Sequence, residues 1–209
     1  KKMIDLYSSP TPNGRKISIM LEELSVDFNP ILVNLEKKEQ FSEKFSKISP
    51  ANKIPVIVDN DNKQTVFESG AILLYLAKKY DKFLNKDKYW EIVQWVFFQM
   101  AYVGPMLGQA HQYLFYHPGK SKFAEDKTKG YAQHIYSILD KRLSKQEYFS
   151  DTYSIADISI WPWTARYERH QINLHDYPNV LRWYKQISTR PAVIKGYNSV
   201  GEFYEIPQP

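Results

Sequence analysis

The fold of the N-terminal part of the chain is decided by the stretch Leu6-Tyr7-Ser8-Ser9-Pro10-Thr11-Pro12-Asn13-Gly14-Arg15-Lys16. Residues 3–7, which end inside this stretch, alternate apolar and polar side chains and predict a short β-strand. Residues 8–14 then combine serine, proline, asparagine and glycine, which interrupt regular structure. From Ile17 to Leu24 the apolar side chains follow the spacing of an amphipathic helix that ends near Ser25. The sequence therefore predicts a strand that leads directly into a helix.

The next part of the chain continues this alternation of strands and helices. Residues 31–34 predict a second strand, and residues 54–58 and 65–67 are β-branched runs that predict an antiparallel hairpin. Residues 69–80 predict a helix that is apolar nearly all round and therefore packs on two sides. The order βαβ and then ββα predicts an α/β fold in which one small sheet mixes parallel and antiparallel strands.

Strand signals end near residues 81–87, and long helical periods follow. We therefore expect an α/β domain over residues 1–82 and an all-helical domain over residues 88–209. The predicted helices of the second domain are Trp90 to Leu114, with a bend at Gly104-Pro105, the segment of Tyr131 to Leu139, Ile155 to Glu168, and the segment of Val180 to Ile187.

Composition narrows the classes of function. The 209 residues include no cysteine, which excludes disulfide bonds, thiolate metal sites and a cysteine nucleophile within the chain. The net charge is +5, but lysines alternate with acids, as in residues 36–39, so we expect no nucleic-acid partner. The five histidines have no metal-site spacing, so we expect no metal. The richest apolar run, residues 95–101, is too short to span a membrane, and no secretory signal is visible, so we expect a cytoplasmic protein without membrane contact.

Two predicted helix starts carry candidate binding groups. Thr11 and Asn13 offer a hydroxyl and an amide beside the first helix, and Ser69 offers a hydroxyl where residues 69–80 begin. Free backbone N–H groups and the positive end of the helix dipole stabilise anions at such places. Two helix starts at one sheet edge could bind a ligand with more than one carboxylate. The alternative is that these side chains only cap their helices.

Two further features have structural interpretations. Pro55 removes a ladder donor, so it belongs at a strand start or holds a special conformation, and the sequence does not decide its isomer. Ser154 precedes Asp157 by three residues and resembles a capping box that fixes the start of a buried helix. We expect the capping residues to contribute to stability rather than to chemistry.

Several motifs, in order, resemble those of one family. They are the junction from Leu6 to Lys16, Asn52-Lys53-Ile54-Pro55, Phe67-Glu68-Ser69-Gly70-Ala71-Ile72-Leu73, Gly104-Pro105-Met106-Leu107-Gly108-Gln109 and Tyr153-Ser154-Ile155-Ala156-Asp157-Ile158. Over nearly its whole length the chain is similar to the cytosolic glutathione transferases. Within them it resembles the Nu-class bacterial disulfide-bond oxidoreductases and the globular domain of the fungal nitrogen-regulatory prion protein.

This resemblance implies a thioredoxin-like N-terminal domain, an all-helical C-terminal domain, a homodimer and bound glutathione as cosubstrate. It implies that Pro55 is cis, so that the backbone of Ile54 pairs with the cysteinyl part of glutathione. Glu68 and Ser69 match positions that hold the γ-glutamyl end. The remaining matched binding positions are Gln40, Lys53 and, for a second glutathione, Lys127.

The resemblance also assigns the position of the glutathione sulfur. Thr11 and Asn13 match the positions beside it, where other classes use a tyrosine, serine or cysteine side chain. Tyr7 is not expected to serve as a catalytic tyrosine in this subgroup. Ser9 is the alternative, because serine-type classes use a hydroxyl close to this position.

Three functions follow as hypotheses. The first is a glutathione-dependent disulfide-bond reductase that acts on a small-molecule disulfide by thiol–disulfide exchange. The second is a conventional transferase that conjugates glutathione to electrophiles, with Ser9 or Thr11 activating the thiol. Its pocket would be walled by aromatic side chains, for which the candidates are Phe97, Tyr102, Tyr113 and Trp163. The third is a non-catalytic glutathione-binding regulator, because a fold alone does not determine a function.

Overall fold

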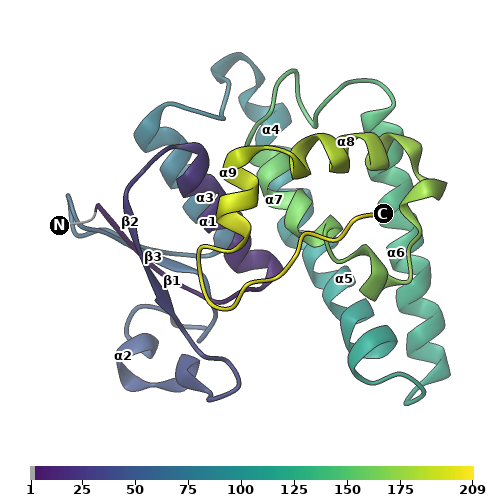
Figure 1. The fold of residues 1–209 in the computed structure, drawn as a ribbon, viewed down its shortest axis with the longest axis horizontal. Helices are drawn as coiled ribbons and strands as arrows, with labels where there is room; N and C mark the ends of the chain where they lie inside the picture. The colour runs from purple at the N-terminus through teal and green to yellow at the C-terminus, as the bar shows by residue number, and fades with distance from the viewer. Residues whose placement is uncertain (1–2) are drawn as a thin grey trace. The chain divides into compact units, whose positions relative to one another are not determined.

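The computed structural model describes residues 3–209 and divides the chain into two compact units (Figure 1). The first unit runs to Leu84 and also includes Thr189–Ile206, and the second comprises Asn85–Ser188 and Pro207–Pro209. No helix in the described part of the chain is both long and apolar enough to cross a membrane.

The first unit contains a four-stranded sheet in the order β2-β1-β3-β4. Its strands are β1 (Ile4–Ser8), β2 (Phe28–Leu32), β3 (Val56–Asp59) and β4 (Thr65–Phe67). Strands β1 and β2 are parallel, whereas β1 with β3 and β3 with β4 are antiparallel. The predicted mixed sheet is therefore confirmed. Strand β2 lies earlier than the predicted residues 31–34, because it is an edge strand whose Asn29 and Pro30 hide the usual apolar alternation.

Helix α1 (Pro12–Glu23) begins where β1 ends, as predicted. Thr11 is its N-cap, and the Thr11 hydroxyl oxygen accepts a hydrogen bond from the Gly14 N–H at 3.2 Å. Glycine is required at position 14 because a Cβ there would lie 2.2 Å from the carbonyl oxygen of Ser9 and 2.3 Å from the hydroxyl of Ser8. The first turn of α1 therefore lies directly against the end of β1.

Helix α3 (Ser69–Tyr80) has the predicted bounds and packs against α1, β3 and β4. Ile72, Leu73 and Leu76 are fully buried. Glu68 occupies the N-cap position with φ = 70° and makes no side-chain capping bond. Between the sheet strands β2 and β3 the chain forms a short 3₁₀ helix, Glu39–Phe41, and the single turn α2 (Glu43–Ser46).

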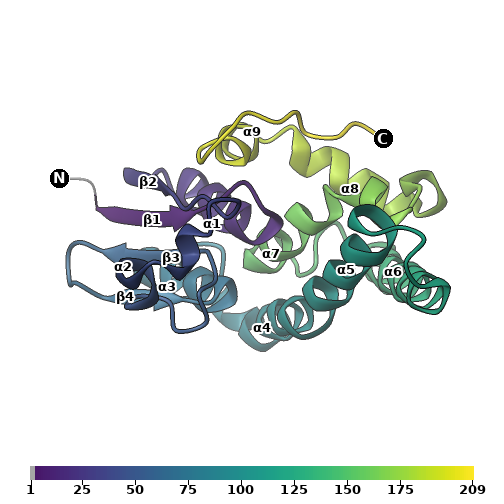
Figure 2. The same ribbon diagram turned by 90° about the horizontal axis from the view of Figure 1, so that it is seen from below.

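Helix α9 (Pro191–Tyr197) packs on α1, and Figures 1 and 2 both show it, in yellow, beside α1. The Ser18 hydroxyl donates a hydrogen bond of 2.6 Å to the carbonyl of Gly196, where a Cβ would lie 2.5 Å from Ile19 Cα. Arg190 donates two hydrogen bonds to the Glu23 carboxylate at 2.6 and 2.9 Å. The compact units therefore differ from the expected domains 1–82 and 88–209, because residues 189–206 belong to the first unit.

All the regular secondary structure described in the second unit is helical. Its α-helices are α4 (Tyr89–Phe98), α5 (Gly104–Ala110), α6 (Lys122–Leu143), α7 (Ile155–Thr164) and α8 (Pro178–Ser188). Short 3₁₀ helices occupy Lys86–Lys88, Tyr167–His170 and Leu174–Asp176. The helix predicted from Trp90 to Leu114 is interrupted by wider π-helical turns at Gln99–Val103, just before the predicted bend, and at His111–Tyr116.

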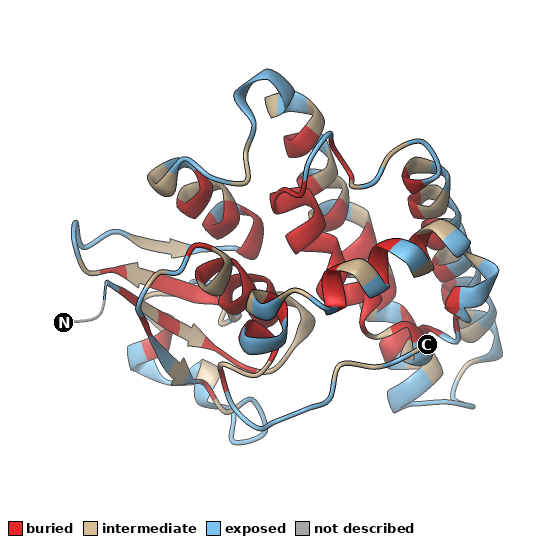
Figure 3. Ribbon diagram, turned by 45° about the horizontal axis from the view of Figure 1, so that its top comes forward, coloured by how far each residue is buried: buried red, intermediate tan, exposed pale blue. Residues whose placement is uncertain are grey.

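Helix α7 is buried along its whole length and is among the red elements of Figure 3. Its N-terminus is held by the predicted capping box. The Ser154 hydroxyl accepts from the Ala156 N–H at 3.2 Å, and the Asp157 carboxylate accepts from the Ser154 N–H at 3.0 Å. The same carboxylate accepts from the Trp183 indole N–H at 2.8 Å. This box therefore joins the start of α7 to α8.

We expect Ser154→Ala to destabilise the second unit because it removes the N-cap acceptor from a fully buried helix start. The expected loss is about 1 kcal/mol, which corresponds to a melting temperature lower by about 2–4 °C. Ser144→Ala is the matched control, since the exposed Ser144 hydroxyl bonds only locally to the Lys141 carbonyl in the described hydrogen-bond network. Equal melting temperatures for Ser154→Ala and the wild type would contradict the structural role of the box.

A second buried polar group in this unit joins two histidines. His111 Nε2 lies 2.8 Å from His170 Nε2, and His170 Nδ1 lies 3.0 Å from the hydroxyl of Tyr136. Burial, with the nearby charges of Arg169 and Arg166, lowers the pKa of His111 to about 4. Burial also lowers the pKa of His170 well below its usual value, with the charge of His111 adding to the effect. Both rings are therefore neutral in the folded protein at neutral pH.

These histidines predict acid lability. Their pKa values are lower in the folded than in the unfolded chain, so the unfolded chain binds more protons and stability falls as the pH drops from about 6.5 to about 4. Each histidine contributes up to about 1.4 kcal/mol per pH unit. Asp157 has the opposite effect on stability below about pH 6. Burial raises its pKa to about 6, so there the folded chain binds more protons at this carboxylate than the unfolded chain does. A comparison with a histidine variant therefore isolates the histidine contribution.

The variant is His111→Gln, which cannot titrate and keeps a hydrogen-bonding side chain. Melting temperatures measured between pH 7 and pH 4 should fall less steeply for His111→Gln than for the wild type. His117→Gln, at an exposed position, should follow the wild type. Parallel pH profiles for His111→Gln and the wild type would refute the contribution of the pair.

Candidate functional site

A cavity of about 140 Å³ lies in the first unit, where the starts of α1, β3 and α3 converge. Its lining residues are Asn13, Ser49, Ala51, Lys53, Ile54, Pro55, Phe67, Glu68 and Ser69. Most of the predicted binding residues are therefore brought together, although they come from three separate segments of the sequence. Thr11 lies at the N-cap of α1, two residues before Asn13, and is not itself among the lining residues.

The loop before β3 forms one wall of this cavity. The Ile54–Pro55 peptide bond is cis, as the family resemblance implied. Pro55 is buried and Ile54 is half-buried. The Ser49 hydroxyl donates to the Lys53 carbonyl at 2.8 Å and accepts from the Lys53 N–H at 3.0 Å, so the buried Ser49 fixes the backbone that presents the exposed Lys53 side chain.

The opposite wall contains the polar side chains of the two helix starts. Asn13 Oδ1 accepts a hydrogen bond of 2.8 Å from Lys16 Nζ. The Ser69 hydroxyl oxygen accepts a hydrogen bond of 3.2 Å from the same ammonium group. Ser69 is the first residue of α3 and not its N-cap, which is Glu68, so the simple capping interpretation of Ser69 was wrong. Thr11, in contrast, is an N-cap, as one of the alternatives predicted.

Lys16 was missed as a site residue by the sequence analysis. Its side chain is only 1% exposed, and burial lowers its pKa well below the usual value, against the opposing effect of the Glu68 charge. A signal was available, because Lys16 stands four residues before the buried Met20 and three after Asn13, so all three share one side of α1. A lysine on the buried side of a helix needs polar partners.

The other predicted residues of the first unit have separate environments. The Ser9 hydroxyl is buried and donates its hydrogen to the carbonyl of Val33. The Tyr7 ring packs on the ring of Phe45 at 6.3 Å between centroids. Gln40 Oε1 is buried and has no hydrogen-bond partner among residues 3–209, although Gln40 does not line the cavity.

Lys127 belongs to the second unit, on α6. Its ammonium lies 5.5 Å from the ring centre of Phe123 and 5.9 Å from that of Tyr131. Among the candidate wall residues, Trp163 is buried and packs on His111 at 5.4 Å between ring centroids, so it is a core residue. Tyr102 is half-buried and lies 5.6 Å from the ring of Phe98.

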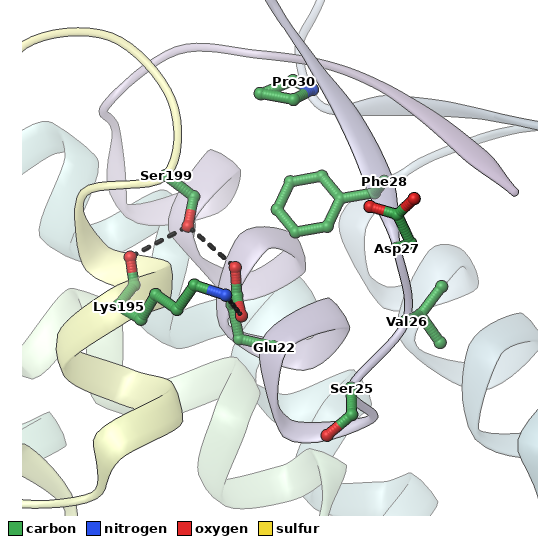
Figure 4. A pocket seen from close by; sticks show the side chains of 8 residues that line it. All are labelled: Glu22, Ser25, Val26, Asp27, Phe28, Pro30, Lys195 and Ser199. Carbon is green, nitrogen blue, oxygen red and sulfur yellow. Dashed lines mark hydrogen bonds and ion pairs between the residues drawn. The ribbon is translucent and has the colours of Figure 1, made fainter. Parts of the chain in front are cut away.

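A larger hollow of about 470 Å³ lies elsewhere in the first unit, beside the end of α1, β2 and α9 (Figure 4). It contains none of the predicted site residues. Glu22, which faces it, forms an ion pair of 2.8 Å with Lys195 and accepts a hydrogen bond of 3.3 Å from the Ser199 hydroxyl. Its one basic side chain, Lys195, is paired with Glu22, and Asp27 adds a second acidic group, so this hollow lacks the convergent donors of the smaller cavity.

The smaller cavity is suited chemically to an anionic ligand. Two helix N-termini, the Asn13 amide, the Ser69 hydroxyl and the Lys53 ammonium supply hydrogen-bond donors or positive charge beside the single lining carboxylate, Glu68. The Lys16 ammonium lies behind Asn13 and Ser69. Backbone groups beside the cis Pro55 add a peptide-like surface. No group of histidine, aspartate and glutamate side chains suited to a metal ion occurs among the described residues.

Comparison with known proteins identifies the family. Residues 3–78 match the glutathione S-transferase N-terminal domain, and residues 103–191 match the glutathione S-transferase C-terminal domain. The disulfide-bond oxidoreductase YfcG of Escherichia coli is 43% identical over 198 residues, which cover 91% of this chain and 92% of the relative.

Two solved structures are similar in both sequence and fold. A glutathione transferase from Burkholderia graminis, with two glutathione molecules bound per subunit, has a TM-score of 0.89 and 37% identity, and the match covers 95% of this chain and 88% of the other. A glutathione transferase from Pseudomonas putida, with one glutathione disulfide bound per subunit, has a TM-score of 0.89 and 36% identity over 94% and 91% of the two chains. The predicted thioredoxin-like and all-helical fold is thereby confirmed. The chain belongs to the glutathione S-transferase family.

Proposed function

We propose that the protein is a glutathione-dependent disulfide-bond reductase that acts by thiol–disulfide exchange. The observation that carries this proposal is the cavity at the starts of α1 and α3, which gathers donors for a thiol-bearing peptide in a chain that has no cysteine. The similarity to YfcG, a disulfide-bond oxidoreductase, supports the same reaction class. The reactive sulfur then comes from glutathione itself.

Separate groups of residues bind the γ-glutamyl and cysteinyl parts of glutathione. The γ-glutamyl end meets Glu68 and Ser69, where the first turn of α3 supplies backbone N–H donors for its carboxylate. The cysteinyl backbone pairs with Ile54 beside the cis Pro55. Gln40 and Lys53 supply further polar contacts, Lys53 from the wall of the cavity and Gln40 from outside its lining, where its Oε1 has no hydrogen-bond partner within residues 3–209.

Thr11 and Asn13 stabilise the sulfur as a thiolate. A free thiol with a pKa near 8.5 is mostly protonated at neutral pH, and each unit of depression needs about 1.4 kcal/mol of preferential thiolate stabilisation. The start of α1 supplies N–H groups and a positive dipole end, and Asn13 lies at its second residue. Ser9 is less suited to this task, because its hydroxyl hydrogen is donated to the Val33 carbonyl.

The reaction proceeds in two balanced exchanges. The thiolate of one glutathione attacks a disulfide, forming a mixed disulfide and releasing one substrate thiolate, which takes up a proton. A second glutathione thiolate then attacks the glutathione sulfur of the mixed disulfide, forming oxidised glutathione and releasing the other substrate thiol. Lys127 supplies positive charge for this second glutathione. The Burkholderia graminis relative, with two glutathiones per subunit, supports this stoichiometry.

The proposal predicts which side chains matter for activity. Asn13→Ala should lower kcat/KM for a small glutathionylated disulfide by about tenfold to a hundredfold, the effect of losing one hydrogen bond to a charged group. Ser9→Ala should keep most of the activity and lose about 1 kcal/mol of stability, because it removes a buried hydrogen bond. Steady-state assays with that disulfide and with an aromatic halide measure both activities.

Other outcomes would select the other functions. Rapid conjugation of the halide without disulfide turnover, abolished by Ser9→Ala, would establish a conventional transferase. Tight glutathione binding without turnover of either substrate would establish a non-catalytic regulator. The Lys79→Met variant is the stability control, since Lys79 pairs with Asp59 and Asp61 outside the cavity.

We also infer a cytoplasmic homodimer. Trp90 and Phe97 are 77% and 60% exposed and stand seven residues apart, so they share one side of α4. Exposed aromatic side chains grouped on one side of a helix are typical of protein interfaces. A reducing cytoplasm also keeps glutathione in the thiol form that the reaction consumes.

The dimer predicts a mass of about twice 24.7 kDa in analytical ultracentrifugation. Phe97→Glu should shift the protein toward the monomer, because it introduces a charge into the proposed interface. Phe203→Glu, at an aromatic residue that is 73% exposed in the C-terminal segment, is the control and should remain dimeric. A wild-type protein that sediments as a monomer at micromolar concentration would rule out the dimer.

A further inference from the structure

Lys16 links the two helix starts that border the cavity. Its ammonium donates to Asn13 Oδ1 at 2.8 Å on α1 and to the Ser69 hydroxyl oxygen at 3.2 Å on α3. The side chain is 1% exposed, whereas Asn13 is half-buried and lines the cavity with Ser69. Lys16 itself is not among the lining residues, so it lies behind the two side chains that face a ligand.

The chemistry of an ammonium group determines how its partners are oriented. An ammonium has three donors and no acceptor, so any amide or hydroxyl bound to it must turn an oxygen toward it. Asn13 therefore accepts through Oδ1, and its remaining polar group is the donor Nδ2. Ser69 likewise accepts from Lys16 through Oγ, and a hydroxyl held in this way can also act as a donor through its hydrogen. One buried cation thus makes both side chains donors toward their other neighbours.

We infer that Lys16 is a positioning residue of the glutathione site, which fixes Asn13 and Ser69 as donors toward the thiolate and the γ-glutamyl carboxylate. This inference rests on the proposed function. Without Lys16, the Asn13 amide could rotate and present Oδ1, an acceptor that repels a thiolate. Burial lowers the pKa of Lys16, and the charge of Glu68, the N-cap residue of α3, acts against this and favours the protonated form.

A purely structural role is the alternative. Burying a lysine is costly unless its charge is satisfied, so Lys16 could serve only to join α1 to α3. That role predicts a loss of stability on substitution and no specific effect on bound sulfur. The two roles differ in the pKa of the glutathione thiol, because only the positioning role acts through the side chain of Asn13.

The test is a pH titration of the thiolate ultraviolet absorbance of glutathione bound to the full-length protein. The wild type should hold the thiol pKa below the free value of about 8.5. Lys16→Met, which keeps the length of the side chain but has no donor, should raise the pKa by about one unit, which means about tenfold less thiolate at neutral pH. Lys16→Arg keeps charged donors and should retain at least part of the depression.

Two further variants show whether Lys16 acts through Asn13. Asn13→Ala alone should raise the thiol pKa, and Lys16→Met in the Asn13→Ala background should add much less than it does in the wild type. Lys79→Met, another lysine whose loss removes ion pairs in the same unit, should lower the melting temperature without changing the thiol pKa. If Lys16→Met does not fold, Lys16→Gln replaces it in the same comparison.

The outcomes separate this inference from the proposed function. Wild-type protein that binds glutathione with an unshifted thiol pKa, or does not bind it, would overturn both. A depressed wild-type pKa that Lys16→Met leaves unchanged would overturn only the role of Lys16. An equal rise caused by Lys16→Met in the wild type and in Asn13→Ala would also overturn it, because the lysine would then act independently of Asn13.

Discussion

Two neighbouring buried cations in the first turns of α1 connect this helix to two other helices of the first unit. Arg15 donates to the carbonyl of Tyr197 at 3.0 Å and lies 3.7 Å from the centre of its ring, which joins α1 to α9. Lys16 donates to Asn13 and Ser69, which joins α1 to α3. Removing such charges from water costs several kcal/mol unless hydrogen bonds replace the lost hydration. Gly14, just before them, lets the same turn lie against the end of β1. The candidate site is built on this turn, so the contacts that stabilise the unit also orient its binding groups.

Local periodicity predicted most of the secondary structure. The bounds of α3 agreed with the prediction because an apolar segment between a strand and the αL residue Asp81 has clear limits. Strand β2 was misplaced because Asn29 and Pro30 are tolerated only at a sheet edge, which a single segment does not reveal. The membership of α9 in the first unit was also missed. No helix was predicted for residues 191–197, and the packing of α9 depends on Gly196 meeting Ile19, a contact between residues far apart in the sequence.

The candidate site was predicted through the family resemblance more than through local patterns. Asn13, Ile54 and Ser69 come from segments that only the tertiary fold brings to one cavity. The cis bond before Pro55 was predicted from the resemblance alone, because the residue types of an X–Pro pair do not show whether the bond is cis or trans. Lys16 escaped notice because lysine on an amphipathic helix is normally assigned to the exposed side. Its burial becomes explicable only once Asn13 and Ser69 are known to accept its hydrogen bonds.

The 209 residues contain no cysteine, so the proposed reaction needs a sulfur from bound glutathione. The central claim is that this sulfur lies beside Asn13. A crystal structure of the protein soaked with oxidised glutathione tests this claim most directly. The account predicts density for the tripeptide along Ile54 and Ser69, with a sulfur within hydrogen-bonding distance of Asn13 Nδ2. A sulfur placed against the hydroxyl of Ser9 or Tyr7 instead, with Asn13 turned away, would contradict it.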